Sequence, residues 1–299
     1  MTCLDVKKFD KISYDLAKLA SRAVLYEVSA FPKLGLVTPI TTGAHHDMDF
    51  FTFIDSTTAL HEYFIKFAQT GFKTDLPKDV FKNLRQLGIE AESAMFNATN
   101  GVNTHKGMIF LMATCLGATA SALKNRQSFD DVPVIIKAMT KGLVLDDLTS
   151  LTEDLAKTHG EVLFFKYGVT GIRGEVEKGL PTVFNESLPF YLSLKNVDIN
   201  TKLVLTLLKI MSVCDDTTIL HRKGIKSLHD VKKFASTALE MANTELPNLM
   251  DFLNQEEKNF IKQRISPGGA ADLLAITTFF AFVSEQFFKV DEKREPTYE

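Results

Sequence analysis

Strand-forming patterns are scarce in this 299-residue sequence, because alternating β-branched runs bounded by turns hardly occur. Cysteine is scarce too: Cys3, Cys115 and Cys214 are odd in number, lie far apart and match no metal-binding or redox spacing. These absences argue against a β-rich fold and against a disulfide framework. They predict free thiols in a reducing cytoplasm.

Neither sign of charge dominates, since the formal net charge is -3. A protein that binds nucleic acid normally carries a basic surface, so nucleic acid is not an expected partner. An anionic small ligand stays possible, because a local cluster of Lys and Arg can bind one in an acidic protein. The N-terminal stretch has no apolar core of the signal-peptide type, which argues against secretion.

Long hydrophobic runs are few. Segment 107–123 carries no charge but is rich in Ala, Thr and Gly, and segment 270–283 is apolar apart from Asp272 and two threonines. Both fall short of the roughly 18 apolar residues that make a membrane-spanning helix reasonable. We therefore expect buried core helices and no membrane partner.

Helical periodicity is frequent. In segment 14–26, apolar residues mark one face at alternating intervals of three and one. With 45% hydrophobic residues the chain can bury a sizeable core. The sequence predicts an all-α fold of about ten helices in a single large domain, 1–288, followed by a charged, frayed tail, 289–299. Similar periodic patterns occur in 59–68, 80–95, 132–145, 202–213, 231–241 and 249–265.

Four predicted loops combine glycine with charged or amide residues, and each enters or leaves an apolar helix. Glycine lets a backbone approach a ligand closely, and a helix N-terminus offers free N–H groups to an anion. We expect these loops to surround one cleft that binds a polyanion. They are 31–49, 97–107, 167–181 and 264–272.

The last loop has the clearest signal. Ser266 is a good N-cap, Pro267 fits the first helical position, and Gly268 and Gly269 leave the amides of the first turn open to phosphate. Asp272 is the only charge in the apolar run that follows. The alternative is ordinary capping, with Asp272 complementing the helix dipole.

The second loop places cations where a helix begins. Asn103 or Thr104 can cap the uncharged helix that follows, which leaves His105 and Lys106 at its positive end. Cations at this end oppose the helix dipole, and a bound anion would offset the repulsion. The alternative is that both side chains are simply solvated.

The glycines of the third loop superficially resemble a dinucleotide fingerprint, but no strand–turn–helix unit surrounds them. Arg173 beside Glu175 suits either a phosphate clamp or a structural ion pair.

The first loop holds Lys33 and a group of metal-binding residue types. His45 and His46 are adjacent and would point differently on a regular backbone, so zinc is not favoured. Asp47 or Asp49 can hold magnesium more easily, partly through water.

A further acidic residue, Asp216, lies six residues before Arg222. There Asp216 can take a metal and Arg222 a phosphate; the alternative is a helix end with local pairing.

Together, six segments resemble the triphosphoribosyl-dephospho-CoA synthase family, which accompanies citrate lyase and malonate decarboxylase systems. They occur in that family's order and cover most of the chain, and 101–107 and 266–274 are the most specific. The last matches in outline, with one extra alanine. The six are 31–37, 43–48, 101–107, 171–179, 216–222 and 266–274.

Three positions depart from the family's pattern. Leu34 replaces an expected proline, Thr38 stands where an aspartate is often found, and Thr218 replaces an asparagine. Thr38 removes one possible metal ligand.

The resemblance implies that the ribose 2′-hydroxyl of 3′-dephospho-CoA attacks the anomeric carbon of ATP, and adenine leaves. The product is the prosthetic-group precursor for the acyl carrier protein of citrate lyase or malonate decarboxylase. A downstream holo-acyl-carrier-protein synthase is then an expected partner. The oligomeric state stays open.

This reaction needs a base, cations for the triphosphate, and a negative neighbour for the developing oxocarbenium charge. Glu92 or Glu175 is the candidate for base or oxocarbenium stabiliser, and Asp47, Asp216 and Asp272 are candidates for Mg²⁺. Two alternatives are a magnesium-dependent N-glycosidase or nucleotide hydrolase, and a non-enzymatic nucleotide-binding helical protein. The candidates for substrate and phosphate binding are Lys33, Asn103, His105, Lys106, Arg173, Arg222, Ser266, Gly268 and Gly269.

Overall fold

The computed structural model describes residues 3–150, 156, 158–242 and 246–288, and within them it contains twelve α-helices and no strand. The predicted all-α fold is confirmed. The predicted tail, 289–299, lies outside the described residues. The helices are α1 Cys3–Ser29, α2 Phe50–Lys73, α3 Pro77–Ala98, α4 Lys106–Lys124, α5 Val132–Thr140, α6 His159–Tyr167, α7 Gly171–Glu177, α8 Leu188–Ser193, α9 Ile199–Val213, α10 Thr217–Ala242, α11 Leu246–Gln263 and α12 Gly268–Val283.

Two helices, α4 and α12, lie in the interior. They contain the apolar segments 107–123 and 270–283 noted in the sequence, and each helix extends beyond its segment. By length and composition alone α4, or α12 together with the π-helical turn that continues it to Phe288, could cross a membrane, but the apolar windows are 78% and 61% buried inside the protein. Such burial is typical of core helices, and it explains why neither shows the one-sided apolar face of a surface helix.

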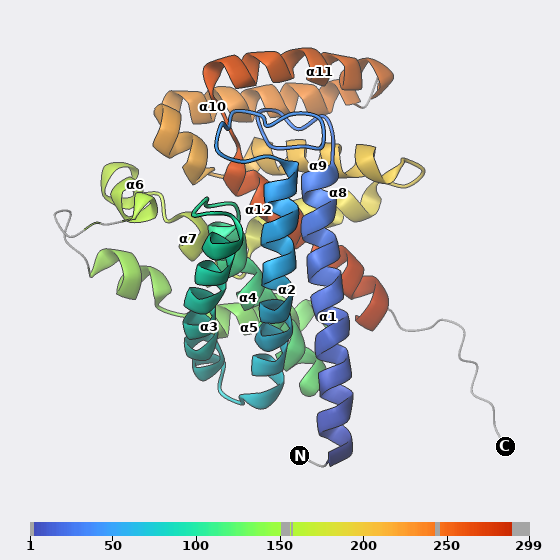
Figure 1. Ribbon diagram of the computed structural model, residues 1–299, viewed down its shortest axis with the longest axis vertical. Helices are drawn as coiled ribbons and strands as arrows, with labels where there is room; N and C mark the ends of the chain where they lie inside the picture. The colour runs from blue at the N-terminus through green and yellow to red at the C-terminus, as the bar shows by residue number, and fades with distance from the viewer. Residues whose placement is uncertain (1–2, 151–155, 157, 243–245, 289–299) are drawn as a thin grey trace.

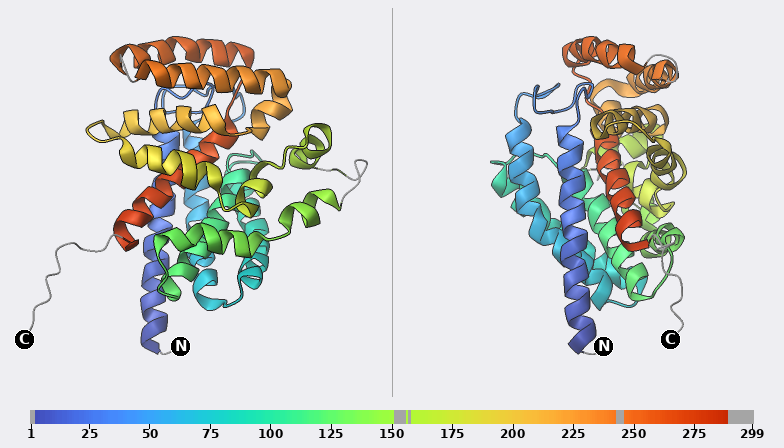
Figure 2. Two further views of the ribbon diagram at one scale, coloured as in Figure 1. Left: turned by 180° about the vertical axis from the view of Figure 1, so that it is seen from behind. Right: turned by 90° about the vertical axis from the view of Figure 1, so that its right-hand side faces the viewer.

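The long helices pack around this interior. Figure 1 shows α1 and α2 side by side along the long axis, with α10 and α11 lying across one end of the molecule. The views in Figure 2 show α12 running beside α1, against which it packs. The buried side chains of helices from α1 to α12 form one hydrophobic cluster, so the elements share a single core.

Two sequence-based boundaries were wrong. The helix predicted over 132–145 ends at Thr140, because Gly142 adopts a φ of 86°, which is a helix-breaking conformation. The segment 167–181, predicted as a loop, contains α7. With seven residues, two of them glycine, α7 is too short for helical periodicity to show in the sequence.

Two cysteines are buried inside the fold. Cys115 lies in α4 and Cys214 ends α9, and both are free thiols, as predicted. Burial raises the pKa of both thiols well above the ordinary value.

One buried carboxylate caps two helices. Asp216 Oδ1 accepts hydrogen bonds from the amides of Thr218 (2.8 Å) and Ile219 (3.1 Å) at the start of α10. Its Oδ2 accepts one from the amide of Ala270 (2.8 Å) at the start of α12. Asp216 therefore joins two helix N-termini that are far apart in sequence.

The predicted cap of α12 was wrong. The helix begins at Gly268, with Pro267 as its N-cap residue, and Asp216 supplies the capping carboxylate. The Ser266 hydroxyl instead lies 2.9 Å from His45 Nε2. A capping group from a distant part of the chain leaves no local signal.

Replacing Asp216 with Ala should lower the free energy of unfolding by about 2–4 kcal/mol, since each lost cap costs about 1–2 kcal/mol. Asp198→Ala is the matched control, because Asp198 caps only α9 through the amide of Thr201. Urea denaturation of both variants measures the difference, and equal losses would contradict the double-cap interpretation.

Candidate active site

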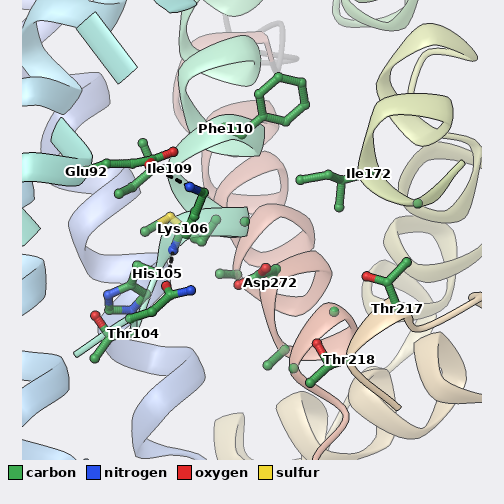
Figure 3. Close-up of a pocket in the computed structure, with 18 of the residues that line it drawn as sticks. Glu92, Thr104, His105, Lys106, Ile109, Phe110, Ile172, Thr217, Thr218 and Asp272 are labelled. Carbon is green, nitrogen blue, oxygen red and sulfur yellow. Dashed lines mark hydrogen bonds and ion pairs between the residues drawn. The ribbon is translucent and has the colours of Figure 1, made fainter. Parts of the chain in front are cut away.

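A cavity of about 1000 Å³ is lined by residues from all four glycine-containing segments. Figure 3 shows one part of it, where α4 and α12 approach each other with Lys106 and Asp272 between them. Phe110 and Ile172 form a neighbouring apolar part of the same lining. The cavity thus combines charged groups with an apolar wall.

Most of the residues predicted for the site line this cavity, and two do not. Glu175 and Asp216 are absent from the lining. The predicted residues that line it are Lys33, Asp47, Glu92, Asn103, His105, Lys106, Arg173, Arg222, Ser266, Gly268, Gly269 and Asp272.

Both carboxylates outside the lining have structural partners. Glu175 Oε1 accepts a hydrogen bond from the amide of Thr182 (2.7 Å), and burial raises the pKa of Glu175. Asp216 is 3% exposed and occupied by the amides of two helices. For Asp216 the helix-end alternative therefore describes the structure, and neither contact favours a catalytic or metal-binding role.

Lys106 and Glu92 form an ion pair in the cavity. Lys106 Nζ lies 2.9 Å from Glu92 Oε2, which joins the first residue of α4 to α3. Asn103 Oδ1 accepts a hydrogen bond from the Lys106 amide (3.1 Å), but the N-cap residue of α4 is His105, which makes no side-chain cap, so the predicted cap by Asn103 or Thr104 was wrong. Both side chains of the ion pair are partly exposed and can exchange partners when a ligand enters.

Lys33 lies deeper than a loop lysine is expected to lie. Its side chain is 1% exposed and pairs with the buried Glu27 of α1. Burial lowers the pKa of Lys33, and it raises the pKa of Glu257 on α11 to about 7 despite the nearby Lys33. Lys33 therefore adds positive potential beneath the cavity, while its ammonium group is already paired.

The His45–Asp49 segment shows no preformed metal site. His45 Nδ1 is 3.8 Å from Asp47 Oδ1, and Asp49 caps α2 by accepting a hydrogen bond from the amide of Thr52. Burial and the nearby Arg222 lower the pKa of His45. Within the described residues, no group of three or more His, Cys, Asp or Glu side chains could hold a metal ion.

Two arginines at another part of the lining share one carboxylate. Arg173 Nε lies 3.1 Å from Asp147 Oδ2, and an Arg85 guanidinium nitrogen lies 2.8 Å from Asp147 Oδ1. Sequence reasoning missed Arg85 and Asp147, which are 62 residues apart and belong to no recognisable motif. In the ligand-free structure Arg173 is ion-paired, and its partners are Asp147 and, at 3.6 Å, Glu161 rather than Glu175.

Arg222 differs from the other cations of the lining. Its side chain is exposed, and it has no carboxylate partner among the residues that the structure describes. It is thus available to an anion without breaking an ion pair.

Asp272 is a carboxylate without a hydrogen-bond donor in the described part of the chain. A Cβ atom built on Gly107 would lie 2.3 Å from Asp272 Oδ2, so only glycine leaves room for this side chain beside α4. Burial and the neighbouring carboxylates of Glu27 and Asp216 raise the pKa of Asp272 well above its ordinary value. A positive ligand group would stabilise its ionised form.

His105 is 3% exposed at the start of α4. Burial and the nearby Lys33 lower its pKa to about 3, so the imidazole is neutral at pH 7. A solvated, cationic His105 is therefore excluded.

Comparisons with known proteins agree with the resemblance seen in the sequence. The model of a family described as ATP:dephospho-CoA triphosphoribosyl transferase matches residues 13–289. A probable 2-(5''-triphosphoribosyl)-3'-dephosphocoenzyme-A synthase of Streptococcus equi subsp. equi (strain 4047) is 40% identical over 292 residues, which cover 92% of this chain and 99% of that protein.

A protein of the same name from Streptococcus mutans serotype c (strain ATCC 700610 / UA159) is 40% identical over 288 residues, which cover 90% of this chain and 96% of the relative. No solved structure matches the chain. The family match over nearly the whole described chain and the 40% identical relatives establish that this chain belongs to the ATP:dephospho-CoA triphosphoribosyl transferase family.

Proposed function

We propose that this protein transfers the 5-triphosphoribosyl group of ATP to the ribose 2′-hydroxyl of 3′-dephospho-CoA, with release of adenine. The product is 2′-(5″-triphosphoribosyl)-3′-dephospho-CoA. Family membership supports the reaction. The structural observation that carries it is the unpartnered Asp272 carboxylate, which lies in one cavity with Lys106 and Arg222.

The cations of the lining are proposed to hold the phosphates of ATP. Arg222 can do so directly, because it has no carboxylate partner among the described residues. Lys106 and Arg173 would first exchange Glu92 and Asp147 for phosphate oxygens. Such charge-assisted hydrogen bonds are stronger than neutral ones, which makes the exchange favourable for a multiply charged anion.

The start of α12 contributes less than its sequence indicates. The Gly269 and Ala270 amides already donate hydrogen bonds to Asp216. Gly268 and Ser266 are therefore the residues at the start of α12 that we propose to bind phosphate. Asn103 orients the start of α4.

The transfer forms a bond from the 2′-oxygen of the acceptor to the anomeric carbon of ATP's ribose and breaks that carbon's bond to adenine. The acceptor hydroxyl proton needs a base. We assign this role to Glu92, which lines the cavity, in preference to Glu175, which does not. When Lys106 turns to a phosphate, the Glu92 carboxylate loses its partner and becomes a better proton acceptor. The adenine ring is suited to the apolar wall at Phe110 and Ile172.

Magnesium fits the same arrangement. Mg²⁺ prefers one or two carboxylates together with substrate phosphates and water, rather than a cage of protein ligands. Asp272 is the carboxylate best suited to it, because it has no donor in the described structure and its ionisation is disfavoured without a cation. Asp47 is a second candidate at the cavity edge. When bound, the ion would neutralise phosphate charge.

The biological setting follows from the product. We propose that it serves the acyl carrier protein of citrate lyase or malonate decarboxylase, through a downstream holo-acyl-carrier-protein synthase. A cytoplasmic location suits an enzyme that consumes ATP and dephospho-CoA.

Incubation of the protein with ATP and Mg²⁺, with and without 3′-dephospho-CoA, tests the proposal directly. Adenine should appear only when the acceptor is present. Equal adenine release without the acceptor would identify a hydrolase instead, and tight ATP binding without any adenine release would identify a nucleotide-binding protein.

Asp272→Asn should lower the rate of adenine release about 100-fold or more, because a charge placed for the reacting complex is lost. Asp198→Asn is the control, since Asp198 caps α9 and does not line the cavity. Activity close to wild type across a magnesium titration would contradict the assignment.

The same variant gives a prediction for stability against pH. The folded-state pKa of Asp272 is raised, so the stabilising contribution of this carboxyl to the free energy of unfolding is fully present below the ordinary pKa of 3.8. That contribution is lost as the pH rises through the folded-state pKa. Asp272→Asn should remove this loss. Thermal unfolding of the ligand-free variant should therefore occur at the same or a higher temperature than wild type at pH 7. A large fall would indicate a structural partner.

Lys106→Ala and Arg222→Ala should each weaken ATP binding by about 10- to 100-fold, since a charged hydrogen bond contributes about 1.5–3 kcal/mol. Lys124→Ala is the matched control: Lys124 is the last residue of α4 and pairs with Asp75, away from the cavity. Calorimetric titration with ATP measures the effect. Unchanged affinity in both cavity variants would mean that these cations are ordinary surface groups.

A further inference from the structure

Ser56, which none of the sequence motifs contains, connects to the cavity through His105. Ser56 lies on α2, is fully buried, and its hydroxyl oxygen is 2.6 Å from His105 Nδ1. The Thr104 hydroxyl donates a hydrogen bond of 2.8 Å to the same oxygen. Figure 3 shows Thr104 and His105 beside one another just before Lys106.

This short chain fixes which ring nitrogen of His105 carries the proton. The Ser56 oxygen accepts from Thr104, and His105 Nδ1 is the only other hydrogen-bond partner of this hydroxyl among the described residues, so Nδ1 is the one acceptor for the single Ser56 hydrogen. Nδ1 is thus an acceptor, and in a neutral imidazole the other nitrogen, Nε2, must be the donor. Phe53 packs edge-on against the ring, with centroids 4.9 Å apart, and restricts its rotation.

The donor that results has no partner. His105 Nε2 is buried and makes no hydrogen bond in the described structure, although His105 belongs to the cavity lining. A buried donor without an acceptor costs about 1–3 kcal/mol, so its retention indicates a ligand atom that completes it.

The surroundings indicate the charge of that atom. His105 precedes the first residue of α4, a 19-residue helix whose N-terminus carries positive potential. The nearby Lys33 adds to this potential at the His105 ring. An anionic acceptor is favoured here, and the anionic acceptors of both proposed substrates are phosphate oxygens.

We propose that Thr104 and Ser56 are positioning residues that hold His105 as a neutral Nε2–H donor to a phosphate oxygen of the substrate at the start of α4. The identity of that phosphate rests on the proposed function, whereas the proton position does not. A neutral imidazole can be such a donor at a reaction centre, where it binds an oxygen without carrying charge itself.

Nuclear magnetic resonance of the protein with ¹⁵N-labelled histidine tests the proton position at pH 7 without any substrate. His105 is one of seven histidines, and its signals are those absent from the spectrum of His105→Gln. The ring should show the pattern of a neutral imidazole protonated at Nε2. In Ser56→Ala that single pattern should be lost, whereas Ser13→Ala should retain it. Protonation at Nδ1 in wild type, or an unchanged ring in Ser56→Ala, would overturn the proposal.

Ser13 is the matched control because it is equally buried, bonds only to the Phe9 carbonyl of its own helix and lies outside the cavity lining. Thr104→Val serves as a second relay variant in case Ser56→Ala folds poorly, since Thr104 is only half-buried.

Binding measurements on the same variants identify the ligand. Ser56→Ala and Thr104→Val should weaken the affinity for ATP or for 3′-dephospho-CoA about tenfold, without an equal effect on the other. The substrate affected is the one whose phosphate His105 contacts. His105→Gln, which keeps a distal N–H, should bind more tightly than the shorter His105→Asn. Unchanged affinity for both substrates in all four variants would overturn the phosphate assignment. Absence of adenine release in wild type would count against the proposed function alone.

Discussion

The cavity depends on one buried carboxylate shared by two helices. Asp216 accepts amide hydrogen bonds from the first turns of α10 and α12. The two helices begin at Thr217 and Gly268, which are 51 residues apart. Because both helices must reach the same pair of oxygens, their N-termini are fixed relative to each other. Arg222 on α10 and Asp272 on α12 therefore line the same cavity, although the Asp216 side chain itself is not part of the lining.

Charge around the cavity is balanced rather than excess. Lys33, Lys106 and Arg173 pair with Glu27, Glu92 and Asp147, respectively. Pairing keeps cations of like charge together in the absence of a ligand, and a polyanion can replace the carboxylates when it binds. This arrangement explains how a chain with a formal net charge of -3 can belong to a family whose substrates are polyanions.

The longer helices and much of the cavity lining could be predicted from the sequence. Apolar periodicity marks helices such as α1 and α9, and glycine next to charged residues marks the segments around Lys106 and Gly268. What it does not contain is long-range partnership. The buried state of Lys33 depends on Glu27 of α1 and Glu257 of α11, and Arg85 meets Asp147 across 62 residues. Such contacts arise from packing and have no local pattern.

Cys214 ends α9 two residues before the double cap. Since the thiolate is the form that reacts with alkylating reagents, a buried thiol with a raised pKa reacts only while its surroundings are open. The modification rate of Cys214 would therefore measure how often the region around the double cap opens. The modification rate of Cys115, in the middle of the core helix α4, would measure unfolding of the core. The two buried thiols of the native chain therefore report on two different events, local opening at the double cap and unfolding of the core.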